Sequence, residues 1–228
     1  MAHHSVTGTI DEPVGQVAAE LRKEAASAQR AGTSRGGSSR CSTVLRKLEA
    51  VDRAAYQAVA ETPTPALDRP MRSLSNAANR SRLWLGIAAA IAVTGGRRGR
   101  KAALEGLISL GVSSAIAHLV ATTAARPRPD REGPERFASR QVDMPASSSF
   151  PSRHAASGFA FSYAIGRHIP ELAVPVRLLA GAVAYSRVHI GVHYPGDVVA
   201  GSVIGSGIAA MVSSTGDRLA TRRQRSGR

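Results

Sequence analysis

The sequence contains little cysteine, few aromatic residues and few acidic residues. Its single cysteine, Cys41, excludes a disulfide framework within the chain and a metal site built from cysteines. Phe, Trp and Tyr together make up 4% of the residues, which is too few for a surface that stacks the bases of single-stranded nucleic acid. Lys and Arg outnumber Asp and Glu by 30 to 16, which gives a formal net charge of +14. A surplus this large indicates an anionic partner: nucleic acid, an anionic membrane surface or a phosphorylated substrate.

The N-terminal part lacks the apolar core of a signal peptide, so we expect any membrane insertion to come from internal segments. Residues 1–42 are rich in Ser, Gly, Ala and charged residues. This composition predicts a disordered basic tail, because too little apolar surface is available for burial. From Thr43, apolar residues recur at helical spacing until a run of prolines stops the helix. Residues 43–62 are therefore predicted to form an amphipathic interfacial helix, lying on a membrane surface or on the rest of the fold.

Five apolar blocks rich in Gly, Ala and Ser dominate the remainder of the chain. Small residues allow membrane helices to approach one another closely. Several blocks are shorter than the roughly 20 residues of a spanning helix, so hydropathy alone favours a membrane bundle only slightly over a soluble one. We predict an all-α fold, a membrane-embedded bundle of about five transmembrane helices over residues 83–215, with a basic C-terminal tail over residues 216–228. The blocks cover residues 83–96, 102–125, 155–166, 172–185 and 198–214.

The placement of basic residues favours the membrane. The link Arg97–Lys101 and the basic C-terminal end are separated by four blocks and so lie on the same side, which the positive-inside rule makes the cytoplasm. The loop over residues 126–153 and the connection over residues 187–197 then face the extracytoplasmic side. We therefore predict a multi-pass protein of the cell membrane. Five spans would leave the basic N-terminal tail outside, unless the helix from Thr43 enters the bilayer as a further element.

Three polar clusters lie on this predicted outer side. Each has an ordinary interpretation when taken alone. The Arg-Pro-Arg-Pro run from Arg126 is typical of an extended basic loop, the Ser-Arg-His before the third block is typical of a helix cap, and the His-Tyr-Pro-Gly-Asp run from His193 is typical of a turn. Taken in order, however, the clusters resemble the motifs of the type 2 phosphatidic acid phosphatase (PAP2) family, over roughly residues 83–214.

The PAP2 pattern has a Lys six residues before Arg-Pro, then Pro-Ser-Gly-His, and finally Ser-Arg, five residues, His, three residues and Asp. The third motif is matched completely, the second at three positions and the first only at its Arg-Pro. In chain order, the matching residues are Arg128 and Pro129, then Pro151, Ser152 and His154, then Ser186, Arg187, His193 and Asp197.

The resemblance implies an integral-membrane, metal-independent lipid phosphatase that works through a phosphohistidine intermediate without a cofactor. His193 is the expected nucleophile, and Asp197 is expected to hold the other nitrogen of its ring. His154 would protonate the leaving alcohol and then activate water. The active site would face the extracytoplasmic side, at the depth of the lipid headgroups.

The resemblance also implies phosphate binding by Arg128, Arg187 and Ser152. A phosphate dianion requires fixed cations and N–H donors, and each guanidinium can bind two of its oxygens. Vanadium haloperoxidases share these phosphate-site residues, so a soluble relative of those enzymes is an alternative. Its helices would need amphipathic rather than uniformly apolar faces.

The chain departs from the family pattern at two positions. Ala121 stands where the first motif has its lysine, and Arg153 stands where the second motif has glycine. Arg153 or Arg126 could supply the missing positive charge, whereas a long side chain at residue 153 could instead crowd the space that glycine leaves open. We expect a working enzyme with a relocated cation. The alternative is a catalytically degenerate member that acts as a basic anionic-lipid or partner-binding membrane protein.

His189 precedes His193 by four residues, and the two with Asp197 could suggest a metal site on one helical face. Gly191 and Pro195 interrupt this stretch and make one continuous helix unfavourable. We therefore predict no metal ligand here and interpret His189 as a neighbour of the site.

The expected substrate is a membrane lipid phosphate: phosphatidate, phosphatidylglycerol phosphate, or a polyprenyl phosphate or diphosphate. The abundance of Ala and Arg is typical of a bacterium with a GC-rich genome, where a polyprenyl carrier of envelope synthesis is attractive. Nucleic acid is the least favoured partner, because the arginines alternate with apolar blocks instead of lining one element. The sequence does not indicate an oligomeric state.

Overall fold

The computed structural model describes residues 38–131, 140 and 142–226, and this part of the chain is helical without strands. The helices are α2 (Ser38–Glu61), α3 (Pro65–Ala78), α4 (Arg82–Thr94), α5 (Gly96–Thr123), α6 (Arg153–His168), α7 (Ala173–His189) and α8 (Pro195–Ser226). Short 3₁₀ turns cover Asn79–Ser81 and Pro170–Leu172. The all-α prediction is confirmed for these residues. Most of the predicted N-terminal tail lies outside the described residues.

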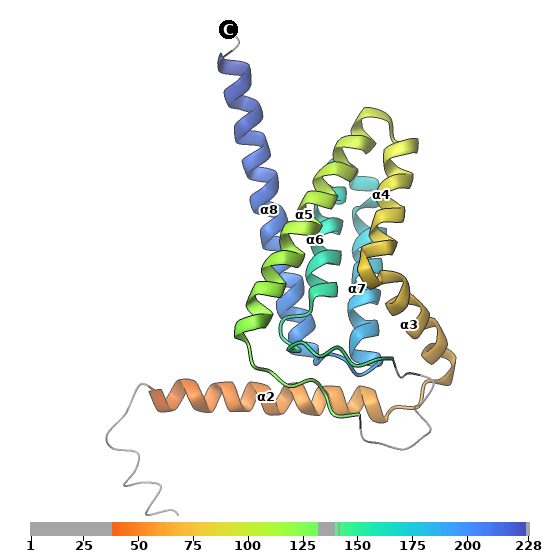
Figure 1. The fold of residues 1–228 in the computed structure, drawn as a ribbon, viewed down its shortest axis with the longest axis vertical. Helices are drawn as coiled ribbons and strands as arrows, with labels where there is room; N and C mark the ends of the chain where they lie inside the picture. The colour runs from red at the N-terminus through yellow and green to blue at the C-terminus, as the bar shows by residue number, and fades with distance from the viewer. Residues whose placement is uncertain (1–37, 132–139, 141, 227–228) are drawn as a thin grey trace, which may run out of the picture. The chain divides into compact units, whose positions relative to one another are not determined.

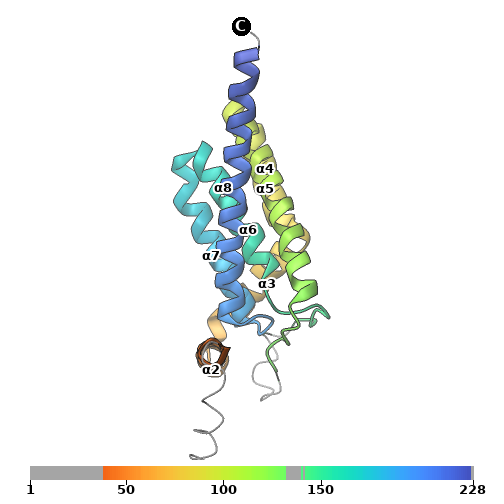
Figure 2. The same ribbon diagram turned by 90° about the vertical axis from the view of Figure 1, so that its left-hand side faces the viewer.

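The chain divides into two units, residues 1–51 and residues 52–228, with the boundary inside α2. In the first unit, α2 exposes the apolar side chains of Val44, Leu45, Leu48 and Val51. The second unit contains every other helix. Figure 1 shows α4 to α8 side by side in one bundle, and Figure 2 shows the same bundle from its edge.

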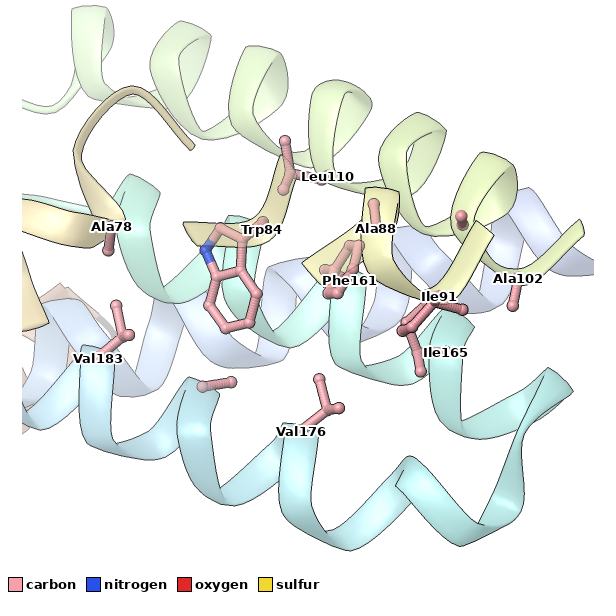
Figure 3. Close-up of a cluster of buried hydrophobic side chains, with 12 residues drawn as sticks. Ala78, Trp84, Ala88, Ile91, Ala102, Leu110, Phe161, Ile165, Val176 and Val183 are labelled. Carbon is pink, nitrogen blue, oxygen red and sulfur yellow. The ribbon is translucent and has the colours of Figure 1, made fainter. Parts of the chain in front are cut away.

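Helix α6 is the centre of the bundle, packed against α5, α7 and α8. Trp84 of α4 and Phe161 of α6 are almost completely buried, and their ring centroids lie 5.4 Å apart. Ile165 and Val183 extend this core, as the close-up in Figure 3 shows. Aromatic burial of this kind contributes a large part of the packing energy of a core.

The outside of the bundle is also apolar. Among the described helices, α5 and α8 are long and apolar enough to cross a membrane. Large aliphatic side chains on several helices are exposed, a distribution typical of a surface that contacts lipid. They include Leu104, Ile108, Leu119, Val174, Leu178, Val199, Val203 and Met211.

The helix boundaries differ from the predicted ones in three places. Helix α3 lies in a proline-rich stretch where no helix is predicted. Pro65 occupies its first turn, where the missing N–H of proline removes no helical hydrogen bond. Helix α2 begins at Ser38, inside the predicted tail of residues 1–42. Helix α8 continues to Ser226, through most of the predicted C-terminal tail of residues 216–228. The predicted end of α2 before the prolines agrees with its last residue, Glu61.

Two glycines one turn apart set the contact between α8 and α6. A Cβ atom on Gly201 would lie 2.4 Å from the carbonyl oxygen of Ser152, and one on Gly205 would lie 2.1 Å from that of Ala156. Real side chains do not come this close, so only glycine allows the two backbones to meet here. The contact places the first turn of α6 beside the second and third turns of α8.

Replacing Gly205 by Ala should therefore weaken the α6–α8 contact, because the added methyl group meets the backbone carbonyl of Ala156. We expect a loss of about 1–3 kcal/mol in the free energy of unfolding. Gly207 of the same helix is the matched control, because a Cβ atom there meets nothing within 4 Å. Thermal unfolding in detergent measures both variants. Equal unfolding temperatures for G205A and G207A would contradict the proposed contact.

Candidate active site

The residues of the three sequence motifs meet at one end of the bundle. His154 lies in the first turn of α6, Arg187 in the last turn of α7 and Asp197 in the first turn of α8. The stretch after α5 and the connection between α7 and α8 reach the same end (Figure 1). Residues far apart in the sequence are therefore neighbours because alternate helix ends meet there.

A small cavity of about 30 Å³ lies among these helix ends. Sites that enclose a whole ligand measure about 300–1,000 Å³, so this cavity fits only one compact group. Five of the side chains that line it are charged or titratable: Arg128, Arg153, His154, Arg187 and His193. The others are Ala121, Pro145, Ser147, Ser148 and Pro151.

His193 and Asp197 form a buried pair. Nδ1 of His193 lies 3.6 Å from Oδ2 of Asp197, whose side chain is fully buried. Nε2, the other ring nitrogen, is therefore the one available to a group in the cavity. Burial lowers the pKa of His193 below its ordinary value, although the neighbouring Asp197 carboxylate acts in the opposite direction. The imidazole is thus neutral near pH 7 and can act as a nucleophile.

Arg187 is the buried cation of the cavity. Its side chain is almost wholly inaccessible, and Nη1 donates a hydrogen bond to Oγ of Ser75 on α3. Its Nε has no hydrogen-bond partner among the described residues. A buried charged donor without a partner is costly unless a ligand satisfies it. This unpartnered donor beside His193 indicates a site for an anion.

Arg128 and Arg153 add positive charge to the same cavity. The guanidinium of Arg128 is anchored by the carbonyl oxygens of Val192, at 2.6 Å from Nη1, and Ser147, at 2.9 Å from Nε. Burial lowers the pKa of Arg128, and the positive charge of Arg153 lowers it further. Arg153 itself is exposed. Three guanidinium groups around a space this small are unfavourable together unless an anion lies between them.

His154 contacts a residue that the motifs do not include. Its Nε2 lies 3.1 Å from Oδ1 of Asn79, at the end of α3. The next two residues, Arg80 and Ser81, have positive φ angles of 53° and 59°. Such backbone strain in residues other than glycine is concentrated at functional sites. We infer that this turn aims Asn79 at His154 and fixes the orientation of the imidazole.

Two predicted phosphate ligands occupy other positions. Arg126 does not line the cavity; its guanidinium lies 2.6 Å from Oδ2 of Asp52 and 2.6 Å from Oδ1 of Asp197. Ser152 caps α6 with its buried hydroxyl, which accepts a hydrogen bond from the N–H of Ala155. The structure therefore gives Arg126 and Ser152 supporting positions, one beside the carboxylate of Asp197 and one at a helix N-terminus.

The part of α2 from Asp52 onward also reaches the site, a contact that the sequence does not predict. Besides holding Arg126, Asp52 accepts a hydrogen bond of 2.6 Å from the backbone N–H of Gly196, at the start of α8. Arg126 lies 4.5 Å above the ring of Tyr194, which packs edge-on against Tyr56 of α2. Burial by itself would lower the pKa of Arg126, but its two carboxylate partners outweigh burial and raise it.

His189 faces away from His193. Its Nε2 lies 3.1 Å from Oδ1 of Asp68, which also accepts a hydrogen bond of 2.7 Å from Nε of Arg140. Arg140 donates to the backbone carbonyls at the end of α2 as well. Within the described part of the chain, no group of three His, Cys, Asp or Glu residues is placed to hold a metal ion. His189 belongs to a structural network that joins α2, α3 and α7.

Comparisons with known proteins find a family and close relatives. Residues 102–219 match the PAP2 superfamily. The chain is 36% identical over 155 residues to the decaprenylphosphoryl-5-phosphoribose phosphatase of Mycobacterium tuberculosis, an alignment that covers 66% of this chain and 84% of the relative. It is 33% identical over 132 residues to the protein of the same name from Mycolicibacterium smegmatis, covering 57% of this chain and 68% of the relative.

Two solved structures share the fold. One is the transmembrane PAP2-type phosphatidylglycerolphosphate phosphatase of Bacillus subtilis, with a TM-score of 0.58, 21% identity, and coverage of 75% of this chain and 87% of the other. The second is LpxE of Aquifex aeolicus, with a TM-score of 0.58, 18% identity, and coverage of 71% and 93%. At this identity the likeness concerns the fold.

The contacts around Asp197 make a prediction about the charge of His193. We expect a pKa for His193 below the ordinary value of about 6.5, because burial outweighs the attraction of Asp197. The D52N variant should lower this pKa further, since it removes a negative charge from the Asp52–Arg126–Asp197 group. The R126Q variant should raise it, since two carboxylates then remain without their arginine. Each change should be about half a pH unit or more.

NMR titration of histidine-labelled protein in detergent measures these values, with the His193 signal assigned by its loss in H193Q. The R126K variant is the matched control because it keeps the positive charge, and we expect its His193 pKa to stay near that of the unmodified protein. Shifts of the same sign in D52N and R126Q would contradict the coupling.

Proposed function

The chain belongs to the PAP2 superfamily, and from this premise we propose that it is an integral-membrane, metal-independent phosphatase acting on a phosphomonoester or diphosphate of a membrane lipid through a phosphohistidine intermediate. One observation carries the proposal: buried Arg187, whose Nε has no hydrogen-bond partner in the described part of the chain, lines a cavity together with His193, and that cavity is large enough for only one compact group. A phosphoryl group bonds to several N–H donors and is attacked at its centre, so it suits this arrangement.

The proposed reaction has two steps. Arg128, Arg153 and Arg187 bind the phosphoryl oxygens. Nε2 of His193 attacks phosphorus and forms a P–N bond while the P–O bond to the lipid breaks, and His154 gives its proton to the departing oxygen. Neutral His154 then takes a proton from water, whose oxygen attacks phosphorus. The P–N bond breaks, and inorganic phosphate leaves.

The supporting residues favour both steps. Asp197 faces Nδ1 of His193 and stabilises the positive charge that the ring acquires when Nε2 attacks. Arg126 and the backbone N–H of Tyr194, at 2.9 Å from Oδ2, keep the Asp197 carboxylate in place. Asn79 accepts a hydrogen bond from Nε2 of His154, so the other ring nitrogen exchanges the proton with substrate and water.

We propose five membrane spans, α4 to α8, with the active site on the extracytoplasmic side. The exposed apolar side chains of these helices and the length of α5 and α8 support this topology. The basic link Arg97–Lys101 and the basic end of α8 would both face the cytoplasm. Residues 43–51 of α2 would lie in the membrane interface, where Val44, Leu48 and Val51 could be buried.

A polyprenyl lipid is the substrate class that we favour over phosphatidate. The mycobacterial relatives are named for a decaprenylphosphoryl-5-phosphoribose substrate, and one alignment covers 84% of the relative at 36% identity. The phosphatidylglycerolphosphate phosphatase shares the fold at lower identity, 21%. Because residues that bind the lipid chain differ among members of one fold, sequence similarity is the better guide here.

The missing lysine of the first motif has a local replacement in this proposal. Ala121 and Arg153 line the same small cavity. The guanidinium of Arg153 can therefore reach the phosphoryl group from the second motif, while the short side chain of Ala121 leaves room for it. The chain would thus keep the number of cations while changing the helix that supplies one of them.

Replacing His193 by Ala should abolish phosphate release from lipid phosphates, a loss of about 10³-fold or more, because the nucleophile is removed. Binding of the same lipid to detergent-solubilised protein should persist, since the three arginines remain. Orthovanadate, which resembles phosphate, should inhibit the unmodified protein. If folded, unmodified protein released no phosphate from any polyprenyl or diacylglycerol phosphate, the lipid-binding alternative would replace the proposed enzyme.

The role of Arg153 is tested by removing its positive charge and then restoring a positive charge at residue 121. We expect R153G to lower kcat/KM by about 10²-fold, because one preorganised cation is lost. The double variant A121K/R153G restores the family pattern and should recover at least about tenfold of that loss. An increase in activity for R153G alone would instead identify Arg153 as an obstruction of the cavity.

A further inference from the structure

A second, larger cavity of about 420 Å³ adjoins the phosphate cavity. Arg187 and Pro145 line both cavities, so the two spaces share a wall that includes the buried guanidinium. The larger space falls within the range of about 300–1,000 Å³ that encloses a ligand. Its other lining residues are Arg72, Asn76, Asn79, Val142 and Asp143. We call this space the headgroup groove.

One face of α3 supplies most of the polar groups in the headgroup groove. Arg72, Asn76 and Asn79 are spaced by four and three residues, so their side chains project in the same direction from the helix and its end. Ser75, one turn from Arg72, binds Arg187 from the same helix. The loop before α6 adds Asp143 on another side. Helix α3 therefore joins the groove to the phosphate site.

Besides Arg187, the lining combines the exposed guanidinium of Arg72 with two side-chain amides and the carboxylate of Asp143. Amide and carboxylate oxygens accept hydrogen bonds from hydroxyl groups, and amide nitrogens donate to them. A guanidinium such as that of Arg72 binds a phosphate bidentately. A groove with this lining suits a ligand that carries several hydroxyls and a second anionic group. It suits poorly the two apolar chains that begin a few atoms from the phosphate of phosphatidate.

We propose that the headgroup groove binds a hydroxylated headgroup, a sugar or polyol that separates the phosphate to be hydrolysed from a phosphodiester to the lipid. Arg72 contacts the phosphodiester, and Asn76 and Asp143 contact the hydroxyls. This inference rests on the proposed function, because it assigns the part of the substrate next to the scissile phosphate. The groove would thus select the substrate, while the small cavity carries out the reaction.

The test compares two substrates on the full chain in detergent. One is ribose 5-phosphate joined at its C1 oxygen through a phosphodiester to a farnesyl chain, and the second is farnesyl phosphate. We expect R72Q to lower kcat/KM for the sugar lipid by about 10- to 100-fold, the effect of losing a charged hydrogen bond. Farnesyl phosphate should change less than about twofold, since it leaves the groove empty. The D143N variant should show the same selectivity.

Arg69 provides the matched control. It lies one turn before Arg72 on α3, is exposed, and does not line the groove. The R69Q variant should behave as the unmodified protein with both substrates. Equal losses with both substrates in R72Q, or no loss with either, would overturn the headgroup assignment while the phosphatase proposal stands.

A binding measurement separates this inference from the proposed function. Calorimetric titration of the H193A variant with the sugar lipid does not depend on turnover. H193A/R72Q should bind it about 10- to 100-fold more weakly than H193A. If the unmodified protein proves inactive but this difference is found, the catalytic proposal fails and the groove assignment holds. Equal affinity of the two variants overturns the assignment.

Discussion

The buried negative charge of Asp197 is the constraint on which the site depends. A carboxylate without exposure to water is stable only when it is fully paired, and here three groups surround it. Arg126 lies 2.6 Å from one oxygen, the N–H of Tyr194 lies 2.9 Å from the other, and the His193 ring faces the same oxygen. Arg126 in turn requires Asp52. The orientation of His193, the nucleophile in our proposal, therefore depends on Asp52, a residue of α2 far outside the motifs.

Close helix packing at Gly201 keeps Asp197 and its partners near His154. Because Gly201 lets α8 approach the start of α6, the backbone N–H of Ser152 donates a hydrogen bond of 2.9 Å to the carbonyl oxygen of Asp197. His193, in the connection just before α8, and His154, in the first turn of α6, are thus held at the ends of two helices whose backbones touch. A bundle with larger residues at this contact would separate them, since every added methyl group would push the helices apart.

In our proposals, helix α3 serves both the phosphate site and the headgroup groove. It supplies Ser75 to the buried Arg187 and Asn79 to His154, and it lines the adjoining groove with Arg72. Residues that activate the phosphate and residues that select the headgroup would therefore share one rigid support. In the same proposals Arg153 supplies the cation that the first motif lacks, because the interaction of a guanidinium with a bound phosphate depends on the distance between them and not on its position in the sequence.

Sequence patterns alone predict the helical class and the place of the five bundle helices, with α4, α6 and α7 located to within four residues at each end. They also predict the charged and titratable side chains that line the small cavity. Apolar periodicity and the spacing of His193 and Asp197 act over one or two helical turns, so they can be read locally. The packing of the helices was needed to show that Arg126 supports Asp197, that Asn79 contacts His154 and that α3 lines a groove. The first two contacts join residues 71 and 75 positions apart in the sequence. Helix α3 is not predicted because its prolines usually interrupt a helix. Their geometry depends on how the helices pack, which no local pattern records.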